Sequence, residues 1–233
     1  MLGEKRMNNR KNDIWNFSSR KSKNIPIALN NLILCCGEKT EKQYFERMCE
    51  IIKNNYCQIT GINFDIQVCA LDPLKMANKA KFKGIQSSQS GKEYQHVWVV
   101  FDKDDFEKDN FDNSIKKLIE LNKSGVEKGP IFHPLWSNEC IELWFLLHFI
   151  FLESNITRKD YENKLSKRIG EKYLKNDIDI FEKIQRKKGC IRNAIINAKK
   201  EIENHKGKTP SECKPATTVF EFFEHYKEYL PLE

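Results

Sequence analysis

The residues from Leu32 to Phe45 read Leu-Ile-Leu-Cys-Cys-Gly-Glu-Lys-Thr-Glu-Lys-Gln-Tyr-Phe, and this stretch decides the fold. An apolar run stops at Gly37, and a threonine-led segment that carries carboxylates follows it. A short, nearly continuous apolar run bounded by glycine is typical of a strand that is covered on both faces. Thr40 is a favoured helix N-cap, so the stretch predicts a strand, a tight turn and the start of a helix.

A second apolar run, Val97 to Phe101, is followed directly by Asp-Lys-Asp-Asp. Asp102 and Asp104 are two residues apart, and in extended backbone such side chains point to the same side. Parallel sheets place their sites at the carboxyl ends of the strands. Carboxylates are the usual protein ligands of Mg²⁺ at sites that act on phosphates. The pattern therefore predicts a metal-binding cleft, in which the turn after Cys36 supplies a third carboxylate.

Apolar runs and helical patterns alternate along the chain. Strands are predicted at 27–36, 63–70, 94–101 and 129–135, and helices at 40–55, 73–83, 114–123 and 140–151, with polar loops at 84–93 and 105–113. This order is typical of an α/β fold with a mostly parallel central sheet. Beyond it, helices are predicted at 157–170, 176–187, 189–205 and 219–230. The chain therefore divides into an extended arm, 1–26, an α/β domain, 27–153, and a helical C-terminal region, 154–233.

Positive charge is concentrated in two parts of the chain. The net charge is +7, and residues 1–31 hold seven Lys and Arg against two acids. Residues 154–208 hold 16 Lys and Arg against 8 acids. Basic segments of this kind can follow the phosphates of a nucleic acid. A solvated terminus and a solvated helical face are the alternative interpretations of the same charge.

Several classes of protein are not indicated. No apolar run approaches the roughly 20 residues of a membrane span, and no signal-peptide core follows the basic N-terminus, so a cytoplasmic protein is expected. The eight cysteines form no CxxC pair, so they are expected to be free thiols rather than zinc ligands. No P-loop and no GxSxG motif occurs, and the five histidines have no metal-binding spacing; His148 is interpreted as a core residue.

Three ordered motifs and a C-terminal segment resemble the RloB-like family of bacterial proteins. Residues 35–45 resemble its Cys-Glu-Gly-Glu-x-Thr-Glu-x-x-Tyr-Phe turn, and residues 99–106 resemble its aspartate strand. Residues 136–149 resemble its Ser-Asn-Pro-Cys-Phe-Glu-Leu-Trp-x-Leu-Leu-His-Phe block, and residues 214–219 its C-terminal Asn-Pro-Ser-Thr segment. The matches run from about residue 31 to residue 226, which is nearly the whole body of the chain.

The resemblance implies a Toprim-like three-layer fold, in which a glutamate after the first strand and a DxD motif after a later one bind Mg²⁺ (or Mn²⁺). It also implies a metal-dependent nuclease effector that cleaves RNA, tRNA in some relatives, or DNA in anti-phage defence and abortive infection. The implied partners are nucleic acid and an ABC-type ATPase, and no membrane. A homo-oligomer is left open.

Four acids of this chain match the acids of the family. Asp102 and Asp104 match the aspartates of the DxD motif. Glu41 matches the second acid of the first motif, and Glu38 matches the acid after the glycine. The resemblance therefore implies that these four residues hold the metal ion, with Glu41 or Glu38 also able to act as a general base on water.

Further residues are implied to support the site. Ser137, Asn138 and Glu142 match the third block of the family. Lys39 and Lys103 flank the acids, as does Lys42, and they could steady a phosphate or the charge that develops on it. Simple charge balance is the alternative interpretation of these lysines.

The chain departs from the family at Cys36, which stands where the Toprim glutamate is expected; Glu139 likewise replaces the usual proline. A thiol is a poor ligand for Mg²⁺ and prefers softer metals. Glu38 or Glu41 replaces the missing ligand in one interpretation, and a softer ion such as Mn²⁺ or Zn²⁺ is bound in another. A third makes the chain a catalytically weakened protein that binds nucleic acid or a partner ATPase without cleaving. The plainest alternative is a soluble α/β protein whose acid cluster is a structural cap.

Overall fold

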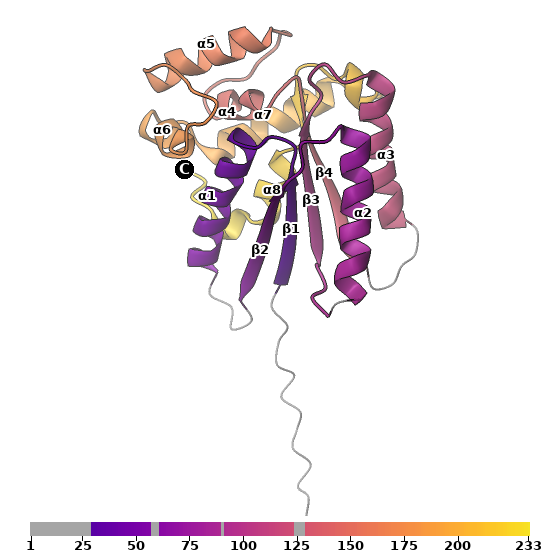
Figure 1. Cartoon of the computed structure of the whole chain (residues 1–233). Helices are drawn as coiled ribbons and strands as arrows, with labels where there is room; N and C mark the ends of the chain where they lie inside the picture. The colour runs from indigo at the N-terminus through magenta and orange to yellow at the C-terminus, as the bar shows by residue number, and fades with distance from the viewer. Residues whose placement is uncertain (1–28, 57–60, 90, 124–128) are drawn as a thin grey trace, which may run out of the picture.

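The structure, a computed structural model, describes residues 29–56, 61–89, 91–123 and 129–233, and the predicted arm at 1–26 lies outside the described residues. Five strands form one sheet in the order β2-β1-β3-β4-β5 (Figure 1). They are β1 (Leu29–Cys35), β2 (Ile62–Val68), β3 (His96–Asp102), β4 (Ile131–Asn138) and β5 (Ala216–Thr217). The first four are parallel, and β5 runs antiparallel to β4. The predicted α/β fold with a mostly parallel central sheet is confirmed.

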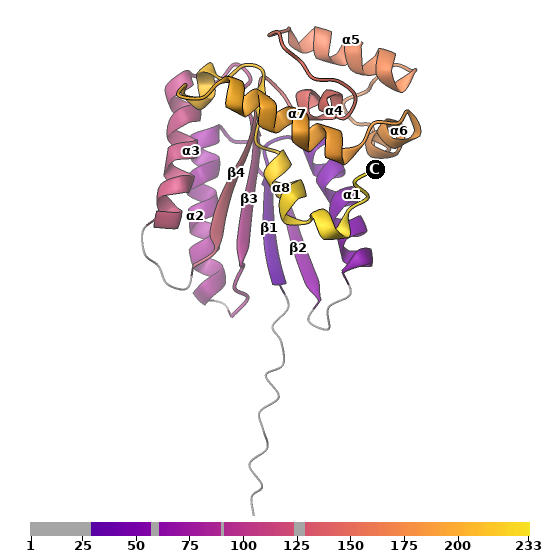
Figure 2. The ribbon, with the colours of Figure 1, turned by 180° about the vertical axis from the view of Figure 1, so that it is seen from behind.

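Helices cover both faces of the sheet and make three layers (Figures 1 and 2). The helices α2 (Pro73–Gln89) and α3 (Lys108–Lys123) pack on one face. The opposite face is covered by α1 (Thr40–Asn55), α4 (Glu142–Leu147), α7 (Ile191–Asn204) and α8 (Phe220–His225). Beyond them lie α5 (Arg158–Ile169) and α6 (Ile180–Arg186). Among the described helices, none is both long enough and apolar enough to span a bilayer.

The central strands are apolar because both of their faces are buried. Ile33 of β1 faces the α1 side, and its neighbours Leu32 and Leu34 face the α2 side; all three have no exposed surface. Trp98 and Val97 of β3 divide in the same way between the two faces. A strand buried on both faces lacks the polar alternation of a half-exposed one, which is why the apolar runs predicted these strands.

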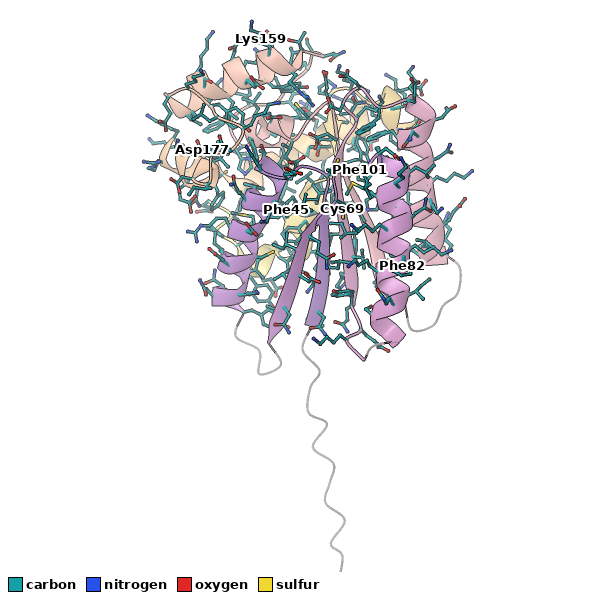
Figure 3. All side chains as sticks on the ribbon, viewed as in Figure 1. Phe45, Cys69, Phe82, Phe101, Lys159 and Asp177 are labelled. Carbon is teal, nitrogen blue, oxygen red and sulfur yellow. The ribbon has the colours of Figure 1, made fainter. Side chains whose placement is uncertain are left out.

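The C-terminal region shares a hydrophobic core with the sheet. The ring of Phe222 in α8 lies edge-on to Phe45 of α1, with 5.1 Å between the ring centroids. Trp144 of α4 donates its indole N–H to the Tyr44 hydroxyl at 2.9 Å and stacks at a tilt on Phe223. Figure 3 shows Phe45 in the interior beside the sheet, whereas Phe82 of α2 lies on the outer surface.

Some element boundaries differ from the predictions. The predicted loop at 105–113 is wrong, because α3 begins at Lys108. Phe111 is completely buried against Phe101, so tertiary packing stabilises an additional turn that the polar sequence does not indicate. The predicted loop at 84–93 is helical as far as Gln89, and Gly84 allows close contact with the ring of Phe132.

The other differences lie in the second half of the chain. The apolar segment predicted as one helix at 140–151 forms only α4, and the last predicted helix is α8 followed by a 3₁₀ turn at Lys227–Tyr229. The fourth strand continues to Asn138, because its last two residues pair with β5. The two residues of β5 had no signal of their own in the sequence. The helices α5, α6 and α7 lie where the periodicity predicts them.

The described cysteines are all free thiols, as predicted; Cys57 lies outside the described residues. Cys35 and Cys49 are buried within the core between the sheet and α1. His148 is also a core residue, as predicted, and its Nδ1 lies 2.9 Å from the Trp144 carbonyl oxygen. Burial lowers the pKa of His148 to about 4.

Three histidines without any metal-binding spacing in sequence come together beside Trp98. His96 Nδ1 lies 3.0 Å from His133 Nε2, and the His225 ring lies edge-on to His96. Burial and the neighbouring histidines lower the pKa of His96 to about 4 and that of His133 to about 3. Because the unfolded chain binds these protons first, the free energy of unfolding falls as the pH drops from about 6.5 towards 4.

We expect His133→Phe to remove part of this acid sensitivity while keeping a ring on Trp98. The difference in unfolding free energy between pH 6.5 and pH 4.5 should shrink by about 1–2 kcal/mol, after allowance for the partial exposure of the ring. Urea denaturation at the two pH values measures it, with His205→Gln as the control. An unchanged pH dependence in the His133 variant would contradict the assignment.

Candidate functional site

A cleft of about 320 Å³ opens at the carboxyl ends of β1 and β3. Its walls come from the turn after β1, the end of β3, the start of α4, the start of α5 and the loop that follows α5. The residues that line it are Gly37, Glu38, Lys39, Thr40, Glu41, Asp102, Asp104, Ile141, Glu142, Arg158 and Lys175. The cleft therefore lies at the edge of the sheet that the sequence predicts for the site, and it contains all four predicted acids.

Asp102, the last residue of β3, carries an unsatisfied oxygen. Its Oδ2 accepts the backbone N–H of Ile141 at 3.2 Å, whereas its Oδ1 is buried without a hydrogen-bond partner among the described residues. Burial raises the pKa of Asp102 well above its usual range, and the nearby carboxylates of Glu41 and Glu142 raise it further. A buried oxygen of this kind is unfavourable unless a proton or a cation accompanies it.

Glu41 lies in the first turn of α1, and its buried carboxylate rests directly against Gly37. A Cβ atom at position 37 would overlap this carboxylate, so any other residue there would push the Glu41 carboxylate out of its observed position. Burial raises the pKa of Glu41, and the charge of Glu142 contributes. The spacing between the glycine and the second acid of the motif thus has a steric cause.

Glu142 is the third buried carboxylate of the cleft. It begins α4 and accepts a hydrogen bond from the Tyr173 hydroxyl at 3.1 Å. The carboxylates of Glu41, Asp102 and Glu142 come from three separate elements and repel one another when ionised. The cluster therefore favours any ligand that brings positive charge.

Asp104 reaches the cleft by a route that the sequence does not indicate. The strand ends at Asp102, and Asp104 lies in the following turn with a φ of 45°. The rule for residues two apart in extended backbone therefore does not apply to this pair. Oδ1 of Asp104 pairs with the Arg158 guanidinium at 2.6 Å. Among the described residues, no three His, Cys, Asp or Glu side chains are grouped so that they could hold a metal ion as they stand.

Cys36 does not line the cleft. Its Sγ donates to the Leu71 carbonyl at 3.4 Å, and the side chain packs on the α2 side of the sheet. Burial and the charges of Glu41 and Asp102 raise the pKa of this thiol to about 12. Cys36 is therefore protonated at neutral pH, and the structure gives no support to its binding a softer metal as a thiolate.

The other predicted residues divide between the rim of the cleft and structural positions. Glu38 and Lys39 are exposed at the rim. Lys103 folds back to donate to the Phe106 carbonyl in its own loop, outside the cleft. Lys42 pairs with Glu46 along α1.

Ser137 and Asn138 are buried on β4 and face the C-terminal segment instead of the cleft. The Ser137 hydroxyl lies 3.0 Å from the Thr217 hydroxyl of β5. The amide group of Asn138 donates to the Ser211 carbonyl at 3.0 Å. These two residues hold β5 on the edge of the sheet, and Glu139 pairs with Lys214 at 2.8 Å on the same segment.

Three cleft residues were not predicted from the sequence: Arg158, Lys175 and Tyr173, which approaches through its bond to Glu142. The prediction that Thr40 caps α1 is wrong: the helix begins after Lys39 without a side-chain cap, and the Thr40 hydroxyl donates to the Lys175 carbonyl instead. All three residues belong to the basic segment 154–208. Its charge indicated the region, but no local pattern distinguishes Arg158 and Lys175 from its other cations, or Tyr173 from its other apolar residues.

Acids from the first three motifs thus meet in one cleft, and the family comparison covers all of it. The sequence model of the RloB-like protein family matches residues 31–225. The chain belongs to the RloB-like family. No curated protein and no solved structure matches it. The matched span of this RloB-like chain extends from β1 to the end of α8, so Arg158 and Lys175 lie within the family region.

Proposed function

We propose that this RloB-like protein is a divalent-metal-dependent phosphodiesterase that cleaves nucleic acid. The observation that carries the proposal is the buried Oδ1 of Asp102, which has no partner among the described residues and faces the repulsion of Glu41 and Glu142. A divalent cation would satisfy that oxygen and relieve the repulsion between the carboxylates. A purely structural cap would instead be expected to satisfy its buried acceptor with a donor.

Asp102, Asp104 and Glu41 would hold the ion, with Glu38 at the rim as a further oxygen ligand. Carboxylate oxygens are hard ligands, which suits Mg²⁺ or Mn²⁺. When bound, the ion supplies positive charge at the phosphate oxygens.

The remaining groups of the cleft act on the substrate and on water. Whichever of Glu41 and Glu38 does not hold the ion would act as a general base that accepts a proton from water, and burial raises the pKa of Glu41 above its usual range. Lys39 and Lys175 line the same cleft and are placed to orient a phosphate. Tyr173 holds the carboxylate of Glu142 in position.

The wider setting follows from the family resemblance. We propose a Toprim-type nuclease that attacks tRNA or DNA in anti-phage defence, in the bacterial cytoplasm, together with an ABC-type ATPase. The basic helical region beside the cleft supports a polyanionic substrate, because its 16 Lys and Arg outnumber its 8 acids between residues 154 and 208.

Purified full-length protein incubated with tRNA or DNA tests the proposal. We expect cleavage of one nucleic acid in Mg²⁺ or Mn²⁺ and none in EDTA. Asp105→Asn is the matched control, because Asp105 is an exposed acid of the same loop that does not line the cleft. No cleavage in either metal, with an ATPase partner and ATP present, together with no binding of Mn²⁺ by calorimetry, would exclude this function.

The second candidate is a weakened protein that binds nucleic acid without cleaving it. Cys36 favours it, because the residue in place of the family glutamate is a neutral thiol directed at Leu71. In that case we expect salt-sensitive binding of RNA or DNA that survives loss of Asp102.

Cys36→Glu distinguishes the two candidates. The side chain of residue 36 is directed at Leu71, so a glutamate there becomes a metal ligand only if it turns towards the cleft. If the cleft is an attenuated nuclease and the carboxylate turns in this way, the initial cleavage rate should rise by roughly tenfold or more, since a further metal ligand strengthens a site that stabilises charge by several kcal/mol. Cys36→Gln, which has the same shape without the charge, is the control. No cleavage by either variant, together with nucleic-acid binding that both retain, would argue for binding without catalysis.

A further inference from the structure

Arg158 joins the helical region to the acidic cleft. It is the first residue of α5, and the start of this helix is fixed by a capping box between Thr157 and Asp160. From there its guanidinium reaches Asp104 at 2.6 Å, in the turn after β3. About two-thirds of the surface of each of these two side chains is buried, so the pair lies at the mouth of the cleft and not on the open surface.

The guanidinium has donors that the pair does not use. Its Nε is buried and has no hydrogen-bond partner among the described residues, while one terminal nitrogen contacts Asp104. An arginine offers five N–H donors in a planar fork, a geometry that matches two oxygens of one phosphate. Lys175 lines the same cleft from the neighbouring loop, so a phosphate placed there would meet two cations.

Asp104 has two competing partners, if the function proposed above holds. In the structure it is paired with Arg158, and the described side chains do not form a group that could hold a metal. A divalent ion that binds Asp104 competes with the guanidinium, because two cations held at one carboxylate repel each other. The freed guanidinium would remain beside the bound ion, where the phosphate of a substrate has to lie.

We propose that Arg158 is the phosphate-contacting residue of the cleft, and that its pairing with Asp104 keeps the metal site incomplete until an ion enters. Binding of the metal and binding of the phosphate are then coupled through one side chain. An arginine that only anchors α5 would make the same ion pair but would produce no such coupling.

Calorimetric titration with Mn²⁺ tests the first half of this proposal. Arg158→Ala should bind Mn²⁺ roughly threefold to tenfold more tightly than the natural protein, because it loses a competing and repelling cation. Arg47→Ala is the matched control, since Arg47 pairs with Glu182 at a similar exposure outside the cleft. Equal or weaker Mn²⁺ binding by Arg158→Ala would overturn the proposal.

Fluorescence anisotropy of a labelled single-stranded 20-nucleotide RNA or DNA tests the second half. In Mn²⁺, Arg158→Ala should weaken binding by roughly tenfold, which is the usual value of a charge-assisted hydrogen bond. In EDTA the loss should be smaller, because Asp104 holds the guanidinium. Arg158→Lys should retain part of the affinity, because lysine keeps the positive charge but cannot donate two parallel hydrogen bonds to one phosphate. A loss of equal size with and without the metal would show general charge attraction and overturn the coupling.

The outcomes separate this inference from the function on which it rests. If the natural protein binds no Mn²⁺, the proposed function fails. If it binds Mn²⁺ through Asp102 but Arg158→Ala behaves like Arg47→Ala, only the role of Arg158 fails. Thermal melting of both arginine variants shows whether they are folded, and Arg158→Lys keeps the test decisive should the alanine variant unfold.

Discussion

Asp102→Asn is expected to abolish metal-dependent cleavage and, at the same time, to make the protein more stable. Loss of the central metal ligand should reduce the cleavage rate by roughly a thousandfold, since such a ligand contributes several kcal/mol to the stabilisation of charge. Asparagine has the same shape and still presents an oxygen to the N–H of Ile141. What it removes is the charge that burial, Glu41 and Glu142 disfavour.

The sign of the stability change follows from the raised pKa of Asp102. The folded state keeps this proton to a higher pH than the unfolded chain does, so the free energy of unfolding falls as the pH rises above about 4. The asparagine variant avoids this loss, and its advantage should reach about 1–3 kcal/mol at pH 8 in EDTA.

Melting curves at pH 5 and pH 8, with cleavage assays on the same preparations, measure both effects. Asp105→Asn should change neither quantity. If the variant cleaves at a rate within tenfold of the natural protein, Asp102 is not a ligand of the catalytic metal. If the variant is less stable than the natural protein at pH 8, the claim that the ionised Asp102 carboxylate destabilises the fold is wrong.

Glu201→Gln should stabilise the fold without any connection to the cleft. Glu201 lies on α7 with 1% of its surface exposed, and neither carboxylate oxygen has a hydrogen-bond partner among the described residues. Burial raises the pKa of Glu201 to about 9, and the nearby backbone of Leu152 lowers this pKa by a smaller amount. The unfolded chain loses this proton near pH 4.5, so the protein loses stability as the pH rises from there towards 9.

The glutamine variant should therefore gain on the order of 2–4 kcal/mol at pH 8 and very little at pH 4.5. Urea denaturation at the two pH values measures the gain. Glu203→Gln is the control, because Glu203 is an exposed residue of the same helix that pairs with Lys206. A gain of equal size at both pH values would point to packing instead of titration.

The sequence was sufficient for the four parallel strands and for the acids, for a physical reason, whereas the two residues of β5 carry no pattern. A strand buried on both faces must be apolar along its length, and the polar residues of an α/β site must follow such strands. Asp102 and a carboxylate in the turn after β1 were therefore identifiable from local pattern, and the family resemblance named Glu41 as one candidate for the latter. Arg158 was not, because it reaches the cleft through the packing of α5 over α4, which no short segment encodes.

Cys36 shows a different limit of prediction from the sequence. Its substitution for the family glutamate was visible in the sequence, but the direction of its side chain depends on the alternation along β1. Leu32, Leu34 and Cys36 share the α2 side, whereas Asp102 follows Trp98 to the other side. If the alternation of the buried residues of β1 and β3 is continued to the ends of these strands, Cys36 and Asp102 fall on opposite faces of the sheet. The sequence could therefore have shown that the Cys36 side chain points away from Asp102.

The core that α8 shares with α1 and the sheet bears on how this protein can be altered or recombined. Phe222 packs on both Phe45 and Trp98, so a cut after residue 153 would strip the aromatic cover from one face of the sheet. Arg158 and Lys175 would be lost with it. The helical region is thus not an exchangeable module: a chimera that grafts it from a relative replaces a large part of the core on the α1 side of the sheet and one wall of the cleft in a single step.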